Sequence, residues 1–175
     1  MTLNDEMVAM VYQQRQLVDQ DAFRGAMGAV PTPVSIVTTA LGTPHGTTVS
    51  AFASLSLDPP LVLVSLQDDS DLLGMVRQTR RFGLNVLAFN QAHIAARFAK
   101  RGIDRFADIA WELDHGSPRL HGVASWTACR AADFITAGDH VIVTGLVESA
   151  FNADIAGLVY QHRSFGHFTP VEPAA

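Results

Sequence analysis

The sequence has only one cysteine and few charged residues, and each scarcity excludes a class of protein. Cys129 cannot form an internal disulfide, and it lies in a strand-like stretch where a buried, inert thiol is favoured over a nucleophile. Charged residues make up 17% of the chain and the net charge is -5, so the basic surface typical of nucleic-acid binding is missing. We therefore expect no disulfide framework and no nucleic-acid partner.

Targeting signals and common binding motifs are also lacking. Residues 1–20 have neither a basic segment nor a continuous apolar segment, and no run approaches membrane-spanning length, so we predict a cytoplasmic protein with no membrane partner. No G-x-G-x-x-G follows a predicted strand, and no G-x-x-x-x-G-K-[ST] occurs. The pairs His115 and His121, and His162 and His167, lack cysteine or carboxylate partners at zinc-site spacing, so we expect no metal.

Apolar residues, in contrast, are abundant. They make up 48% of 175 residues, which is high for a soluble monomer of this size and favours a homodimer. The predicted organisation is an N-terminal helical extension over 1–20, one domain over 21–170 and a tail over 171–175.

Hydrophobic spacing and turn residues predict a mainly β domain with a few helices. One or two helices are expected within 7–29, with Asp19 or Asp21 as N-cap; further helices are expected from Ser70 to about Thr79 and after Asn90. Six strands are expected over 34–39, 47–57, 61–66, 81–89, 123–133 and 140–151, with 61–66 buried on both faces. Without a βαβ rhythm, this order indicates an antiparallel barrel.

The strand expected over 47–57 alternates apolar and hydroxyl residues. Apolar residues occupy every odd position from Val49 to Leu57, with Ser50, Ser54 and Ser56 between them. Because alternate strand residues point to opposite faces, the odd positions are expected to face a core. The serines then face water, a partner subunit or a ligand.

Two further features have both a structural and a chemical interpretation. Arg97, Lys100, Arg101 and Arg105 either grip a phosphate or complement the end of a helix. His140, at the start of a strand, is either a turn histidine or an ionisable group at a pocket rim. The residues alone favour the structural interpretation of both.

Several stretches together resemble the flavin reductase family, the small FMN- or FAD-using partners of two-component monooxygenases. The stretches, within about Phe23 to Phe165, are VSIVTT, PHGTTVSAFASLSLDPPLVLVSL, FGLNVL, ARFAKRGIDRF followed by W, AGDHVIVTGLVES and LVY. The resemblance implies a dimeric, six-stranded antiparallel split β-barrel of the FMN-binding type.

The resemblance also implies roles for particular residues. His140 is implied as the catalytic residue beside the flavin and the nicotinamide. Flavin binding is implied for Pro44, His45, Gly46, Thr47, Thr48, Ser50, Ala51, Ser65, Leu66, Gln67, Ser70, Arg97 and Phe98. Val159, Tyr160, Gln161 and His162 are implied to close the nicotinamide pocket. Small residues such as Gly46 and Ala51 let the backbone approach a flat tricyclic ring, so part of the hydroxyl face is expected to line a flavin site.

The chain departs from the family pattern at three places. PTPV, residues 31–34, replaces the usual Thr-Gly-Val before the first strand, and Phe165 replaces a tyrosine. Aspartates at 68, 69 and 71 surround Ser70, and Leu72 stands where a second small hydroxyl is common. Carboxylates at this point repel a nearby phosphate.

The implied activity is that of an NAD(P)H:flavin oxidoreductase. NADH or NADPH would transfer hydride from nicotinamide C4 to N5 of FMN or FAD, and the reduced flavin would pass to a partner monooxygenase. The acidic stretch from Asp68 to Asp71 motivates an alternative, a split-barrel protein without reductase activity that serves as a biosynthetic enzyme or a ligand-binding module for another ligand. A structural subunit of a larger oxygenase would also suit the apolar composition.

Overall fold

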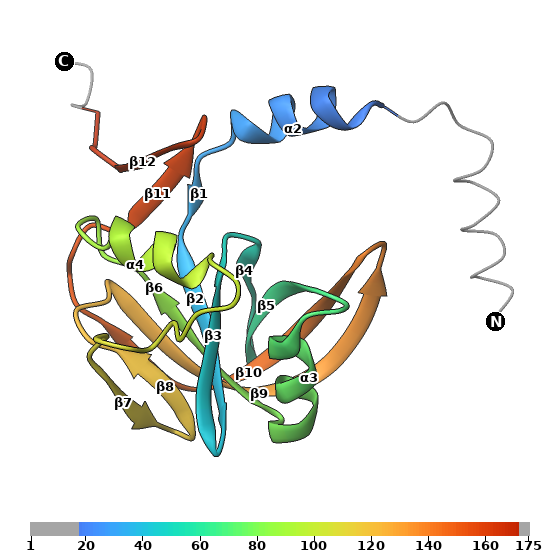
Figure 1. The fold of residues 1–175 in the computed structure, drawn as a ribbon, viewed down its shortest axis with the longest axis vertical. Helices are drawn as coiled ribbons and strands as arrows, with labels where there is room; N and C mark the ends of the chain where they lie inside the picture. Colours follow the sequence, from blue (N-terminus) through green and yellow to red (C-terminus); the bar gives the residue numbers. More distant parts are fainter. Residues whose placement is uncertain (1–17, 172–175) are drawn as a thin grey trace, which may run out of the picture.

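The computed structural model describes residues 18–171, in which one large antiparallel sheet is flanked by two small sheets and three helices (Figure 1). The large sheet has the order β3-β2-β6-β9-β10-β5-β4. Its strands are β2 (Ser35–Leu41), β3 (Thr43–Val49), β4 (Phe52–Leu57), β5 (Pro60–Gln67), β6 (Arg81–Val86), β9 (Ser125–Ala137) and β10 (His140–Asn152). The predicted mainly β class with a few helices is confirmed.

The small sheets and the helices lie around this sheet. One small sheet contains β1 (Thr32–Pro33), β11 (Leu158–Gln161) and β12 (Ser164–His167), and the other contains β7 (Trp111–Asp114) and β8 (Ser117–Leu120). The helices are α2 (Gln20–Gly28), α3 (Asp71–Thr79) and α4 (Ala92–Phe98). No helix within residues 18–171 has the length and apolar character needed to span a membrane.

The large sheet has seven strands where six were expected, because the stretch over 47–57 does not form one strand. β3 ends at Val49 and β4 begins at Phe52, so only Ser50 and Ala51 separate them. β3 pairs with β2 at one edge of the sheet, whereas β4 pairs with β5 at the other edge. The chain therefore passes from one edge strand to the other within two residues.

The expected alternation of buried and exposed residues fails after this break. Val49 is buried as expected, but the odd apolar positions from Ala51 to Leu57 are exposed, and Leu57 is 93% exposed. Phe52 is the β4 residue that packs against the core. A change of register moves a strand's apolar residues to the opposite face, and the break has this effect here. The prediction for these odd positions was wrong.

The helix ends follow local capping rules, with one exception. The Asp19 carboxylate accepts hydrogen bonds from the N–H groups at the start of α2, and Ser70 caps α3, as expected. Asn90 does not cap α4, which was predicted wrongly. Gln91 occupies the N-cap position, and its side chain binds Ala88 N and His121 O instead of the helix. Helical residues expected over 7–17, and most of the 1–20 extension, lie outside the described residues.

The core consists of two clusters of buried side chains. One lies under α3 and includes Phe82, Val64 and Leu66; the other lies under α4 and includes Phe98 and Trp126. β5 is less buried than predicted, since residues 61–63 are only half-buried. Cys129 lies in the first cluster, and burial raises the pKa of its thiol to about 11. A thiol that remains protonated at neutral pH is a poor nucleophile.

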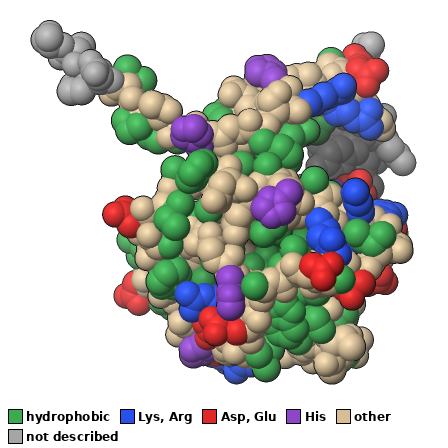
Figure 2. All heavy atoms as spheres, turned by 60° about the vertical axis from the view of Figure 1, so that its left-hand side comes forward, with side chains coloured by type: hydrophobic (Ala, Val, Ile, Leu, Met, Phe, Trp, Pro, Cys, Tyr) green, Lys and Arg blue, Asp and Glu red, His purple; other side chains and the backbone are tan. Residues whose placement is uncertain are grey.

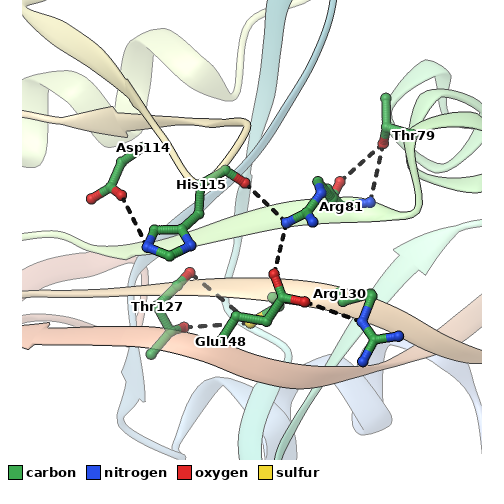
Figure 3. Close-up of polar contacts among 8 residues, drawn as sticks. Thr79, Arg81, Asp114, His115, Thr127, Arg130 and Glu148 are labelled. Atoms are coloured by element: carbon green, nitrogen blue, oxygen red, sulfur yellow. Dashed lines mark hydrogen bonds and ion pairs between the residues drawn. The ribbon is translucent and has the colours of Figure 1, made fainter.

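A group of charged side chains ties three strands together on one surface of the large sheet. The Glu148 carboxylate on β10 accepts hydrogen bonds from Arg81 Nη1 on β6 at 2.7 Å and from Arg130 Nε on β9 at 3.1 Å (Figure 3). These contacts, with that to Arg81 the largest, lower the pKa of Glu148. The same Arg81 donates to His115 O, which links the β7–β8 hairpin to the sheet. This group has a structural role.

Candidate functional site

A cavity of about 1120 Å³ opens among β3, the end of β5, the start of α3 and the loop that follows α4. Residues 43–51, 65–67, 69–72, 99 and 101–107 line it, together with Trp111 and His140. Its volume is large enough for a cofactor-sized molecule.

The cavity brings together most of the residues that were singled out in the sequence. Those that line it are Pro44, His45, Gly46, Thr47, Thr48, Ser50, Ala51, Ser65, Leu66, Gln67, Ser70 and His140. Arg97, Phe98 and the segment from Val159 to His162 are not among its lining residues. Three stretches far apart in the sequence therefore meet at one place.

The threonines of β3 fix α4 against the strand. Thr48 Oγ1 donates to Ala95 O at 2.8 Å, and Thr47 Oγ1 lies 3.5 Å from Phe98 O. Both oxygens belong to the last turn of α4, and Ala95 O also accepts from the N–H of the C-cap residue Ala99. The hydroxyl donors of these two residues therefore hold the fold, and β3 offers a ligand its backbone groups and the side chain of His45.

Backbone groups on the cavity side of β3 are available because β3 is an edge strand. Gly46 O points away from β2 and accepts a hydrogen bond from Arg105 Nη1 at 2.7 Å. In an antiparallel pair, the N–H of a residue points to the same side as its C=O, and the residue two positions along repeats this direction. The N–H groups of Gly46 and Thr48 therefore face away from the sheet, where they can donate to a ligand.

Packing behind the strand leaves little room for a side chain at Gly46. A Cβ at this position would lie 3.0 Å from Thr38 Cγ2 and 3.1 Å from Phe98 Cε1. Phe98 itself is fully buried and supports the cavity wall from behind. The expected reason for this glycine was the close approach of a ring, but the space that its missing side chain leaves is filled by Phe98 and Thr38.

The loop after α4 is held by Arg97, whereas Arg101 lines the cavity. Arg97 Nε and Nη2 donate to Arg105 O and Asp104 O, each at 2.9 Å. Arg101 Nη2 donates to Gln67 Oε1 at 3.2 Å, across the cavity from the loop to the end of β5. Sequence reasoning identified the basic cluster but selected Arg97. It also missed Phe106 and Trp111, which have no periodic signal because they lie in and beyond a loop.

His140 lies at the start of β10, opposite Gln67 of β5. Its Nδ1 is 2.7 Å from Asp139 Oδ1, and the side chain is 38% exposed. This hydrogen bond lowers the pKa of the Asp139 carboxyl. With Nδ1 held by the carboxylate, Nε2 is the ring nitrogen left for a ligand.

His45 is the second histidine of the cavity. Burial lowers its pKa below the ordinary value, and the positive charge of Arg105 acts in the same direction. The carboxylate of Asp71 acts in the opposite direction with a smaller effect. His45 is therefore neutral at physiological pH, where it can donate at one ring nitrogen and accept at the other.

The start of α3 presents acidic groups to the cavity. The Ser70 hydroxyl donates to Gln67 O at 2.8 Å and accepts from Leu73 N at 3.3 Å. Leu72 is buried, and the side chains of Asp69 and Asp71 lie at the cavity. Ser70 thus closes the helix end with the hydroxyl that was expected to bind phosphate.

The expected nicotinamide segment lies in the small sheet of β1, β11 and β12. Thr32 of β1 pairs with Tyr160, whose ring packs at 5.1 Å from that of Phe165. The turn after β11 is tied to the end of α2, since His162 N donates to Gly28 O at 2.8 Å. The contact of this segment with a nicotinamide stays a prediction.

Metal ligands do not gather in residues 18–171. No group of three or more histidine, cysteine, aspartate or glutamate side chains there is arranged to hold a metal ion. The polar residues that line the cavity include two histidines, two arginines and three aspartates, beside the backbone amides of β3, and such a mixed lining suits an organic ligand.

The known proteins that are similar to this chain include flavin reductases and reductase components of monooxygenases. Residues 27–169 match the family model described as flavin reductase like domain. The reductase component of 4-nitrophenol 4-monooxygenase/4-nitrocatechol 2-monooxygenase from Rhodococcus opacus is 37% identical over 160 residues, covering 91% of this chain and 86% of that protein. The reductase component of flavin-dependent trigonelline monooxygenase from Acinetobacter baylyi is 38% identical over 152 residues, covering 85% of this chain and 48% of that protein.

A solved structure of a monooxygenase component also resembles this chain. Nitrilotriacetate monooxygenase component B from Mycobacterium thermoresistibile matches with a TM-score of 0.84 at 33% identity, covering 90% of both chains. The chain spans about half the length of some curated relatives, covering 50% of one from Rhizobium meliloti and 48% of the Acinetobacter baylyi protein. Since the family model matches well over half of the sequence, this chain belongs to the flavin reductase like domain family.

Proposed function

We propose that this chain is an NAD(P)H:flavin oxidoreductase that reduces FMN or FAD and supplies the reduced flavin to a partner monooxygenase. The observation that carries the proposal is the cofactor-sized cavity that collects β3, the end of β5 and His140. The names of similar proteins support it, since they include NADH:FMN oxidoreductase from Rhodococcus erythropolis, NADH:FAD oxidoreductase from Streptomyces globisporus and reductase components of monooxygenases. These names favour NADH as co-substrate.

The cavity walls suit a flat tricyclic ring. The outward N–H groups of β3 can donate to the polar edge of the ring, and the short side chains of Ser50, Ala51 and Ser65 leave room for its face. Phe106 and Trp111 supply apolar surface. Bound flavin supplies N5 as the acceptor of hydride from nicotinamide C4, and the protein contributes positioning and exclusion of water.

His140 is proposed as the catalytic residue. The hydrogen bond that His140 Nδ1 donates to Asp139 fixes the orientation of the ring, and the partial exposure of His140 leaves its Nε2 for a ligand. We assign this nitrogen to orienting the nicotinamide or to handling a flavin proton.

We further propose that the large sheet closes into a split barrel and that the chain forms a homodimer. Support for closure comes from the two edge strands, which Ser50 and Ala51 join directly. Support for the dimer comes from α2, which has no buried residue, and from the exposed apolar residues of β4. The segment from Val159 to His162 does not line the cavity of its own chain, so we propose that it closes the nicotinamide site of the second copy.

The side chains of Asp69 and Asp71 at the cavity favour a second candidate function. In this reading the cavity binds another ligand, and the protein is a biosynthetic enzyme or binding module without reductase activity. A protein that binds neither FMN nor FAD would favour this function over the reductase.

The test is oxidation of NADH and NADPH by the purified protein, followed by absorbance, with and without added FMN or FAD. We expect oxidation that depends on flavin, and the four combinations give the preferred flavin and nicotinamide. Absence of oxidation in all four contradicts the reductase function.

A further inference from the structure

We propose that Arg77 and Arg80, which pack on the ring of Phe134, form a docking site for an acidic segment of the partner monooxygenase. The inference rests on the proposed function in one respect, since it takes the partner to be the protein that receives reduced flavin. None of the three residues lines the cavity, so the docking site is separate from the site that binds the flavin.

Two cations share one aromatic ring at this docking site. The guanidinium carbons of Arg77 and Arg80 each lie 5.0 Å from the centroid of the Phe134 ring. Arg77 belongs to the last turn of α3, Arg80 is the C-cap of this helix, and Phe134 lies on β9. The ring itself packs against the core under α3, so it holds both guanidinium groups at a defined place on the surface.

Neither arginine is neutralised by its own chain. No ion pair within residues 18–171 includes Arg77 or Arg80. Arg80 Nη2 donates to Ala132 O at 2.8 Å, which uses one of its donors. The carboxylate of Asp133, next to the ring in sequence, accepts a hydrogen bond from Thr144 Oγ1 at 3.1 Å instead. The two guanidinium groups therefore retain donors for an anion from outside the chain.

The chemistry of the pair favours a partner that carries carboxylates. A guanidinium group presents parallel N–H donors that match the two oxygens of a carboxylate. Arg81 and Arg130 bind a carboxylate in this chain, since both donate to Glu148. Because the whole chain has a net charge of -5, most of its surface repels an acidic partner, whereas this pair of arginines attracts one.

The docking site adjoins both elements that carry cavity residues on this side of the molecule. α3 begins at the cavity with Asp71, and Arg77 lies about 9 Å further along the helix axis. β9 continues from Phe134 into the hairpin that leads to His140, and α3 lies beside this hairpin (Figure 1). A monooxygenase docked here would lie close to the cavity from which reduced flavin departs.

A fluorescein-labelled hexaglutamate peptide is the probe for this docking site, and fluorescence anisotropy measures its Kd. Two double variants are compared with the wild type: Arg77→Gln/Arg80→Gln, and a control with the same loss of charge at exposed arginines elsewhere, Arg24→Gln/Arg163→Gln. We expect the first to raise the Kd by about tenfold, the loss expected for two exposed charge pairs, and the control to stay near the wild type. Added salt should weaken binding to the wild type.

Four results would overturn the docking site. They are an equal Kd in the wild type and in Arg77→Gln/Arg80→Gln, an equal loss in both double variants, displacement of the peptide by saturating FMN, and tighter binding of a ten-nucleotide oligothymidylate than of the peptide. The second result would reflect net charge alone, the third would place the peptide in the cavity, and the fourth would indicate a nucleic-acid partner.

Flavin reduction separates a failure of the docking site from a failure of the proposed function. Because the two arginines lie outside the cavity, Arg77→Gln/Arg80→Gln should oxidise NADH with added flavin at the wild-type rate. A wild type that binds the peptide through these arginines but oxidises neither NADH nor NADPH with any flavin would refute the reductase function and leave a docking site for an acidic protein.

Discussion

At the scale of single residues, the cavity wall contains groups whose hydrogen bonds are used by the fold and groups that remain open. Thr48, Ser70 and Arg105 each bind backbone carbonyls of their own chain. His140 and Arg101 keep donors or acceptors for a ligand. Residue type alone does not distinguish the two kinds, because the difference arises from contacts between distant segments.

Removal of the His140 ring should affect chemistry more than binding. We expect His140→Ala to slow the hydride-transfer step, followed by stopped-flow absorbance, by about tenfold or more, because general acid–base and orienting groups contribute at least that much. The Kd of flavin should change less. His93→Ala, on the exposed side of α4, is the control. An unchanged rate of flavin reduction in His140→Ala would refute the catalytic role.

The lowered pKa of His45 predicts a pH dependence of stability. The unfolded chain takes up a proton on this ring near its ordinary pKa of 6.5, whereas the folded protein does so only at lower pH. The contribution of the neutral ring to stability is therefore complete above this value and is lost as the pH falls towards the lowered pKa. We expect His45→Gln to lose less unfolding free energy than the wild type between about pH 7 and about pH 5, measured by urea unfolding. Equal losses in both proteins would contradict the assignment.

At this scale, the contacts that could be predicted from the sequence are those between residues close together in the chain. The caps at Asp19 and Ser70 could be predicted because an N-cap binds N–H groups two or three residues away. Asn90 could not be excluded, because the choice of Gln91 depends on its bond to His121, thirty residues further along. Arg101 was placed in a basic cluster by the sequence, but its contact with Gln67 across the cavity could not be predicted for the same reason.

At the scale of strands and helices, the main difference from the sequence prediction is the division of 47–57 into β3 and β4. Strand propensity and alternation are local and do not show that the second half pairs with a different neighbour. The other strands of the large sheet were predicted with small errors at their ends, because hydrophobic runs between turn residues mark them clearly.

Aromatic rings packed over glycines fasten strands of this sheet to one another. A Cβ at Gly83 on β6 would overlap the ring of Trp126 on β9, and one at Gly145 on β10 would overlap Phe82 on β6. We expect Gly83→Ala to lower the unfolding free energy by about 1–3 kcal/mol, the usual effect of overpacking a core. Gly74→Ala in α3, where nothing lies within 4 Å, should raise it by about 0.5–1 kcal/mol. Urea unfolding measures both free energies. An unfolding free energy of Gly83→Ala that is equal to or higher than that of the wild type would contradict this packing.

At the scale of the whole molecule, apolar side chains remain on the surface. α2 exposes Phe23 and Met27, and β4 exposes Leu55 and Leu57. On the face drawn in Figure 2, apolar side chains form broad areas between scattered charged groups. The composition indicated this excess, but only the structure shows which elements carry it.

We expect the protein to be a homodimer in solution, which light scattering after size-exclusion chromatography would measure. Leu57→Asp should shift the equilibrium towards monomer, because a buried charge without a partner opposes association. Leu41→Asp, at another exposed apolar position on β2, is the matched control. A wild-type monomer, or an equal effect of the two substitutions, would contradict an interface at β4.

The two-residue junction at Ser50 and Ala51 connects two strands that have different roles. The stretch before it lines the cavity, and the stretch after it presents the apolar edge where a second copy is proposed to bind. Any ligand that fixes the position of the first stretch also limits the motion of the second. If flavin and the proposed second copy favour the same position of this junction, each strengthens the binding of the other by the same factor. Dilution that separates the proposed dimer would then weaken flavin binding.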